Sequence, residues 1–103
     1  MATRTVVTFE EQNGITTQSD DFVVNPAREV SVVARLISGS PVTGARIQVT
    51  LDEVEKIIAG TATWVNSPLG ARLSSGAEKI LRPVTGVRLS AVDGTWGLQV
   101  RQG

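Results

Sequence analysis

The stretch EVSVVARLI, from Glu29 to Ile37, shows the two-residue period of a β-strand. Because successive side chains in a strand point to opposite faces, this segment has two distinct sides. One side is apolar throughout and consists of Val30, Val32, Ala34 and Leu36. The other side is mixed, with Val33 and Ile37 placed among polar residues. We therefore expect a strand that lines a core on one face and is partly covered, or lies at a contact surface, on the other.

Three later segments repeat the pattern: GARIQVTL at 44–51, GVRLSA at 86–91 and TWGLQVR at 95–101. In each of them polar side chains occupy the alternate positions. The residues predicted to face inward are Ala45, Ile47, Val49, Leu51, Val87, Leu89, Trp96, Leu98 and Val100. Four strands with one apolar face each imply two sheets packed face to face, with their outer faces in water.

Clusters of Gly, Asn, Asp, Ser and Pro interrupt the chain about every eight to twelve residues, as in an antiparallel sandwich or barrel. Asn13–Gly14 predicts a turn, and Asp93–Gly94 predicts a two-residue hairpin between the last two strands. The predicted strands are 4–9, 15–24, 29–37, 44–51, 61–66, 77–82, 85–92 and 95–101. The fold class is all-β: an antiparallel two-sheet β-sandwich, jelly-roll or Ig-like, in a single domain over 1–103. Residues 1–14 are either its first strand or an extended N-terminal arm.

Residues 51–65, LDEVEKIIAGTATWV, break the strand pattern and predict one short helix near 52–59. Asp52 and Glu55 have the spacing of a capping box, and Gly60 suits the position just after a helix. The apolar stripe of this helix consists of Val54, Ile57 and Ile58. A helix of about two turns is not stable alone, so we expect the stripe to dock on the sandwich.

The chain is charge-balanced, with ten basic and ten acidic residues among 103. A nucleic-acid-binding protein normally carries a basic excess, so we expect no nucleic-acid partner. No apolar run is long enough to span a membrane, and the start, MATRTVVTFEEQ, lacks the apolar segment of a secretion signal. Most of the basic residues are arginines, which are enriched at protein interfaces. The composition therefore favours a protein partner.

Side chains for catalysis are scarce, because the sequence contains no His and no Cys. That excludes Ser-His, Cys-His and zinc constellations. The adjacent pairs Glu10–Glu11 and Asp20–Asp21 would point to opposite faces of a strand, so they do not suit glycoside hydrolysis. No loop has an acidic residue at every second position, so Asp20, Asp21, Asp52 and Asp93 do not predict a calcium site. We expect a protein that is not an enzyme and that has no cofactor and no metal.

The two tryptophans are the remaining candidates for a ligand site, as platforms for sugar rings. Trp96 shares a strand face with Leu98 and Val100, so we expect it in the core. Trp64 alternates with Ala62 but borders the turn NSPLG, so core, interface and ligand platform all stay open for it. A sugar site usually adds Tyr, Asn or Asp partners, and this chain has no Tyr.

Residues 49–103 resemble small structural proteins encoded by tailed bacteriophages. The resemblance lies in the succession VTLDEVEKIIAGTATWV, a Gly-containing loop, and ILRPVTGVRLSAVDGTWGLQVRQG. The matching residues are Thr50–Asp52, Ala59–Trp64, Pro83–Leu89 and Asp93–Thr95. They are strand and turn residues and contain no catalytic signature.

This resemblance implies a β-sandwich virion component, such as a capsid decoration (cement) protein that binds the major capsid protein and stabilises the head. It also implies a homo-oligomer, trimer or dimer, on the capsid surface of a virion assembled in the host cytoplasm. The alternatives are a tail, neck or head-fibre component and a carbohydrate-binding host-adhesion module. The residues that we predict at a protein interface are Arg4, Val6, Arg35, Arg46, Trp64 and Arg88.

Overall fold

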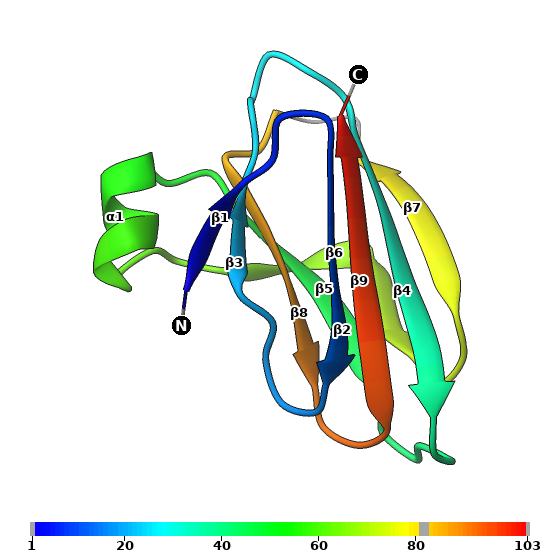
Figure 1. Cartoon of the computed structure of the whole chain (residues 1–103). Coiled ribbons are helices and arrows are strands. Elements are labelled where there is room, and N and C mark those ends of the chain that lie inside the picture. Colours follow the sequence, from blue (N-terminus) through cyan, green and yellow to red (C-terminus); the bar gives the residue numbers. More distant parts are fainter. Residues whose placement is uncertain (1, 81–82, 103) are drawn as a thin grey trace.

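The computed structural model describes residues 2–80 and 83–102. In this part of the chain nine strands form two sheets packed face to face, and one helix lies outside them (Figure 1). The elements are β1 (Thr3–Thr5), β2 (Phe9–Ile15), β3 (Asp21–Val23), β4 (Val30–Ser38), β5 (Ala45–Thr50), α1 (Val54–Ala59), β6 (Val65–Arg72), β7 (Gly76–Ile80), β8 (Gly86–Ala91) and β9 (Thr95–Gln102). The last two residues of the predicted strand 77–82 lie outside the described residues. The predicted strand 61–66 is displaced, because β6 begins only at Val65.

The strand order identifies the sandwich as a jelly roll. One sheet has five strands in the order β1-β3-β8-β5-β6, and the other has four in the order β2-β9-β4-β7. Without β1, each sheet has four strands, in the orders β3-β8-β5-β6 and β2-β9-β4-β7. Eight strands divided in this order between two sheets form the two Greek keys of a jelly roll. The prediction of an antiparallel two-sheet sandwich is confirmed, and the strand order decides for the jelly roll over the Ig-like arrangement.

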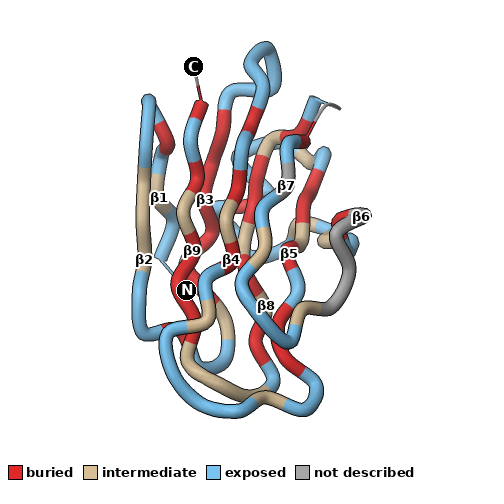
Figure 2. The backbone as a smooth tube through the Cα atoms, turned by 90° about the vertical axis from the view of Figure 1, so that its right-hand side faces the viewer, coloured by how far each residue is buried: buried red, intermediate tan, exposed pale blue. Residues whose placement is uncertain are grey.

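The core lies between the sheets, where the predicted apolar faces meet (Figure 2). Trp96, Leu98 and Val100 of β9 are fully buried. The predicted inward residues of β4, β5 and β8 are buried as well, with Leu36 partly so. Leu51 is the exception, because β5 ends at Thr50 and the Leu51 side chain is 70% exposed. Among the described residues, no helix has the length and hydropathy needed to cross a membrane.

The predicted hairpin at Asp93–Gly94 is wrong, although the turn itself exists. β8 belongs to the five-stranded sheet and β9 to the four-stranded sheet, so this turn carries the chain across the sandwich. Gly94 has φ +78°, in the left-handed region that favours glycine. A turn sequence specifies a reversal of direction, whereas the pairing of the two strands depends on their other neighbours.

The N-terminal strands also differ from those predicted. Residues 3–15 form β1, which pairs parallel with β3, and β2, which pairs antiparallel with β9. The predicted turn at Asn13–Gly14 is instead an irregularity inside β2, where the register shifts between Gln12 and Ile15. Gly14 has φ +75°, as a bulge of this kind requires. The segment 1–14 therefore supplies strands to this chain's own sheets.

The helix begins later than predicted, at Val54 rather than Asp52. Glu53 precedes it without a side-chain capping bond, so the predicted capping box does not form. Asp52 instead accepts a hydrogen bond from the backbone N–H of Thr63, 2.6 Å away, which ties the two ends of the helical segment together. Gly60 follows the helix in the left-handed conformation, φ +76°, as predicted.

Only one member of the predicted apolar stripe docks the helix. Ile57 is 2% exposed, whereas Ile58 is 66% exposed and Val54 36%. The helix lies outside the sandwich, beside β3 on the five-stranded sheet (Figure 1). A single buried side chain therefore holds α1 against that sheet.

Candidate functional site

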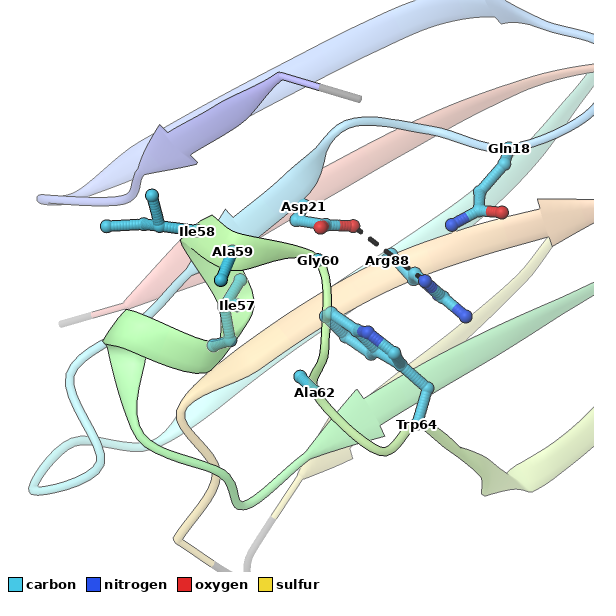
Figure 3. Close-up of a pocket in the computed structure, with 9 residues that line it drawn as sticks. All are labelled: Gln18, Asp21, Ile57, Ile58, Ala59, Gly60, Ala62, Trp64 and Arg88. Carbon is cyan, nitrogen blue, oxygen red and sulfur yellow. Dashed lines mark ion pairs between the residues drawn. The ribbon is translucent and has the colours of Figure 1, made fainter.

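A recess of about 510 Å³ lies between the α1 segment and the outer face of the five-stranded sheet (Figure 3). Both polar and apolar groups line it. They are Gln18, Asp21, Ile57, Ile58, Ala59, Gly60, Ala62, Trp64 and Arg88. We call this space the recess. A second hollow of about 440 Å³ lies at Val49, Leu51, Val65, Pro83 and Val84, so the described residues that line it are all apolar.

Strand alternation brings the two charged residues of the recess together. Phe22 of β3 and Val87 of β8 are paired across the sheet and point into the core. Their neighbours Asp21 and Arg88 therefore point outward on adjacent strands. Figure 3 shows the two side chains directed at each other, with Trp64 beside Arg88.

Trp64 forms a wall of the recess. It does not lie in the core, and its ring is not fully exposed to solvent. Its side chain is half-buried, and the guanidinium carbon of Arg88 lies 4.3 Å from the ring centroid, a cation–π contact. Gly86 makes room for this packing. A Cβ on Gly86 would lie 3.1 Å from Cη2 of Trp64 and 3.0 Å from Cδ1 of Ile57. The missing side chain thus lets both the indole and the helix lie close to β8.

Asp21 and Arg88 form a loose ion pair in a poorly hydrated place. Their closest atoms, Oδ1 and Nη1, are 4.0 Å apart, and Asp21 is 7% exposed. Burial raises the pKa of Asp21, and the positive charge of Arg88 opposes this rise. Burial likewise lowers the pKa of Arg88, against the attraction of Asp21. The Nε–H of Arg88 donates to Oε1 of Gln48 at 2.8 Å, which fixes the guanidinium plane.

Several other acidic residues are engaged in local contacts. The Arg4 Nε–H donates to Asp20 at 2.8 Å, and Gln99 donates to Glu11 at 2.7 Å. Asp93 accepts backbone N–H bonds from residues 42–44. Within the described ranges, no three His, Cys, Asp or Glu residues come together as metal ligands would. The recess itself offers hydrogen-bonding groups and an aromatic wall.

The six residues predicted at an interface do not gather on one surface. Trp64 and Arg88 meet in the recess, and Arg46 is exposed on the outer face of the same sheet. Arg4 is held by its ion pair with Asp20. Val6 is 4% exposed and lies in the core, so its place in an interface is corrected: it follows β1 and donates its N–H to Val23.

Arg35, the sixth, lies on the outer face of the four-stranded sheet, which we call the open face. Strand register places eleven of the described residues there: Phe9, Glu11, Ser31, Val33, Arg35, Ile37, Ala77, Lys79, Gly97, Gln99 and Arg101. The mixed side predicted for residues 29–37 thus faces outward, with Val33 half-buried and Ile37 43% exposed. In the part of the chain that the structure describes, no helix covers this face (Figure 1).

Sequence reasoning missed Asp21 and Gln18 as site residues. The signal for Asp21 was present in the alternation of DDFVV, where a carboxylate precedes a core phenylalanine. Gln18 lies in an irregular segment that joins β8 by one isolated bridge to Ser90, so no periodic pattern could place it. The pairing of β3 with β8, which brings Asp21 to Arg88, joins residues far apart in the chain.

Comparisons with known proteins add little to this picture. A scan of known protein families finds no match, and a search of curated proteins finds no relative. A solved chain of the disulfide-linked pili that form Bacillus endospore appendages is similar, with a TM-score of 0.44 and 18% sequence identity. The aligned region covers 91% of this chain and 81% of that chain. At this distance the likeness gives no indication of function.

Proposed function

We propose that this chain is a non-enzymatic structural protein of a bacteriophage particle, which decorates the capsid by binding the shell of major capsid protein. The resemblance of residues 49–103 to virion proteins of tailed phages supports this partner. The observation that carries the proposal is the open face, where Phe9, Val33 and Ile37 lie among arginines and other polar side chains on an uncovered sheet. Aromatic residues and arginine are enriched in protein interfaces.

Several side chains of the open face are held in place by their neighbours. Phe9 is 39% exposed, and the guanidinium carbon of Arg101 lies 4.8 Å from its ring centroid. Arg35 donates a hydrogen bond to Oδ1 of Asn13 at 3.0 Å. Ordered side chains lose less conformational entropy when a partner binds. The face therefore offers preformed anchors for docking.

The dimensions of the molecule suit a surface-bound role. Its extents are 36, 26 and 20 Å, and a broad side of this size is on the order of the 800 Å² per partner that a specific interface buries. Lys79 of the edge strand β7 forms an exposed ion pair with Glu29 at 2.9 Å, which gives the face a charged border. Charged and polar residues are typical of the rim of a docking surface.

The test is binding to expanded capsids that lack decoration. We expect saturable binding at a fixed stoichiometry. Phe9→Ala together with Arg101→Ala should lower the affinity by about tenfold or more, because anchor residues carry most of the binding energy. Arg46→Ala, on the opposite outer face, is the matched control and should bind as the wild type does. Absence of binding would end the decoration proposal, and binding to purified tails instead would support the tail or neck alternative.

The proposed oligomer, a trimer or a dimer, is tested separately by analytical ultracentrifugation. We expect a mass two or three times that of the 10.9 kDa chain. A monomer at high concentration would contradict self-association in solution and leave the capsid lattice as the only source of symmetry.

A further inference from the structure

The recess contains a polar group that the docking role does not use. Oδ1 of Asp21 is buried, and it accepts no hydrogen bond from any of the described residues. Nη1 of Arg88, with which it forms an ion pair, is 4.0 Å away, beyond hydrogen-bond distance. Nearly all buried polar atoms in folded proteins are hydrogen-bonded. Oδ1 of Asp21 therefore lacks a donor among the described residues, and the recess is the space from which a ligand can supply one.

The separation of the pair fits a hydroxyl group. One hydroxyl oxygen at about 2.8–2.9 Å from each atom can accept from Arg88 and donate to Asp21. An ammonium group could only donate and a carboxylate could only accept, so neither serves both partners. Asp21 and Arg88 carry opposite charges, and they are the only ionisable side chains among the described residues that line the recess. A neutral ligand with hydroxyl groups adds no net charge beside these two opposite charges.

The remaining walls suit the rest of such a ligand. Trp64 supplies an aromatic surface, and aromatic rings pack against the C–H faces of sugars. Gln18 adds an amide that can both donate and accept, while Ala62 and Ile57 supply apolar contacts (Figure 3). A volume of about 510 Å³ lies within the range of small-molecule sites and accommodates one or two sugar rings.

We propose that the recess binds a neutral saccharide, with hydroxyl groups held between Asp21 and Arg88 and the sugar ring in contact with Trp64. The site is independent of the open face, because it lies on the outer side of the other sheet. A protein docked through the open face would keep the recess exposed to its surroundings. The failure of either proposal leaves the other intact.

The test is a two-dimensional NMR titration of the ¹⁵N-labelled protein with methyl glycosides of glucose, galactose, mannose and N-acetylglucosamine. We expect at least one glycoside to shift the indole N–H of Trp64 and the amides of Gly60 and Ala62. A single ring makes few contacts, so the expected Kd is about 1–10 mM. Methyl glucuronide should bind no better than methyl glucoside, because its carboxylate would approach Asp21.

Three variants locate the site. Asp21→Asn, Arg88→Gln and Trp64→Ala should each weaken binding about tenfold, since each removes a charge-assisted hydrogen bond or the aromatic wall. Arg46→Gln, on the same sheet but outside the recess, should bind with unchanged affinity. The spectrum of each variant shows whether the fold is retained, and Asp21→Asn changes the fewest atoms.

Two results would overturn the proposal. One is the absence of any shift in the recess amides at about tenfold the expected Kd for every glycoside. The other is glycoside binding that survives all three recess variants, which would place the saccharide elsewhere. In the first case, water bridges Asp21 and Arg88 and the pair is purely structural.

Discussion

The two outer faces of this jelly roll are built on equivalent strands and yet have opposite characters. The five-stranded sheet is covered by α1 and Trp64, which leave a recess with a buried carboxylate. The four-stranded sheet has no such cover among the described residues and presents Phe9, Ile37 and Arg35 directly to solvent. Inside the sandwich both sheets follow the same apolar alternation.

The difference between the two faces arises from one segment, the connection from β5 to β6, which covers the five-stranded sheet and has no counterpart on the other sheet among the described residues. Fourteen residues, from Leu51 to Trp64, leave the sheet between β5 and β6 and return over its outer surface. They create a concave site of limited volume, which suits a small ligand. The flat face without an insertion suits a partner as large as the sheet itself.

Ile57→Asp should remove the cover from the five-stranded sheet. Ile57 is 2% exposed and is the helix's one buried residue, so a carboxylate there should cost about 3–5 kcal/mol of unfolding free energy. Urea denaturation measures the loss. Ile58→Asp, at the neighbouring position that is 66% exposed, should stay within about 0.5 kcal/mol of the wild type. Equal losses for the two variants would mean that α1 docks through another surface.

Gly86→Ala should strain the packing beneath the helix and Trp64. The added methyl group would meet Ile57, Thr50 and Trp64 at 3.0–3.1 Å, which is closer than normal contact. We expect a loss of about 1–3 kcal/mol, the usual cost of overpacking. Thermal unfolding is the measurement, and Ser90→Ala on the same strand is the control. An unchanged melting temperature would show that the helical segment shifts outward without cost.

Asp93→Asn should weaken the connection between the two sheets in a pH-dependent way. Asp93 accepts from the backbone N–H groups of Val42, Gly44 and Thr43, and these bonds hold its pKa below the ordinary value of 3.8. The stabilisation is present above pH 3.8 and is lost as the pH falls through the lowered pKa. The variant should therefore unfold more easily at neutral pH, and the gap should close in acid. A gap that is independent of pH would assign the effect to packing.

Phe9→Ala should leave the fold nearly unchanged, because the open face is not part of the core. Phe9 is 39% exposed, and the substitution removes only its surface contacts and the cation–π contact with Arg101. We expect a loss of at most about 1 kcal/mol in urea denaturation. A larger loss would mean that the open face stabilises the sandwich and is less free to serve a partner.

Asp21→Asn should give the smallest effect, and its sign should be a gain at neutral pH. The folded pKa of Asp21 is raised, so its favourable contribution is present below pH 3.8 and is lost as the pH rises through the raised pKa. Removing the charge avoids that loss. The measurement is the unfolding midpoint of the wild type and of the variant at acidic and at neutral pH. If the wild type is the more stable of the two at neutral pH, the attraction of Arg88 outweighs the cost of burying the charged Asp21.

Much of the fold was predictable because it depends on local alternation. The inward faces of β4, β8 and β9 and the position of the helix within 52–59 followed from periodicity, and Gly60 followed from its freedom to adopt positive φ. The two errors at turn sequences share one cause. Asp93–Gly94 and Asn13–Gly14 were recognised as turn sequences, but their partners in the sheets are distant in the chain. Turn chemistry carries no information about such partners.

An all-β sandwich with one short helix follows from local sequence patterns, because period-two alternation and turn residues act over a few neighbouring positions. The placement of β8 and β9 in different sheets, and the meeting of Asp21 with Arg88 beside Trp64, arise only when the strands pack together. These outcomes depend on which strands pair, and pairing is chosen by the packing of the whole core rather than by any one segment. The two outer faces, and with them the candidate binding surfaces, are products of that choice.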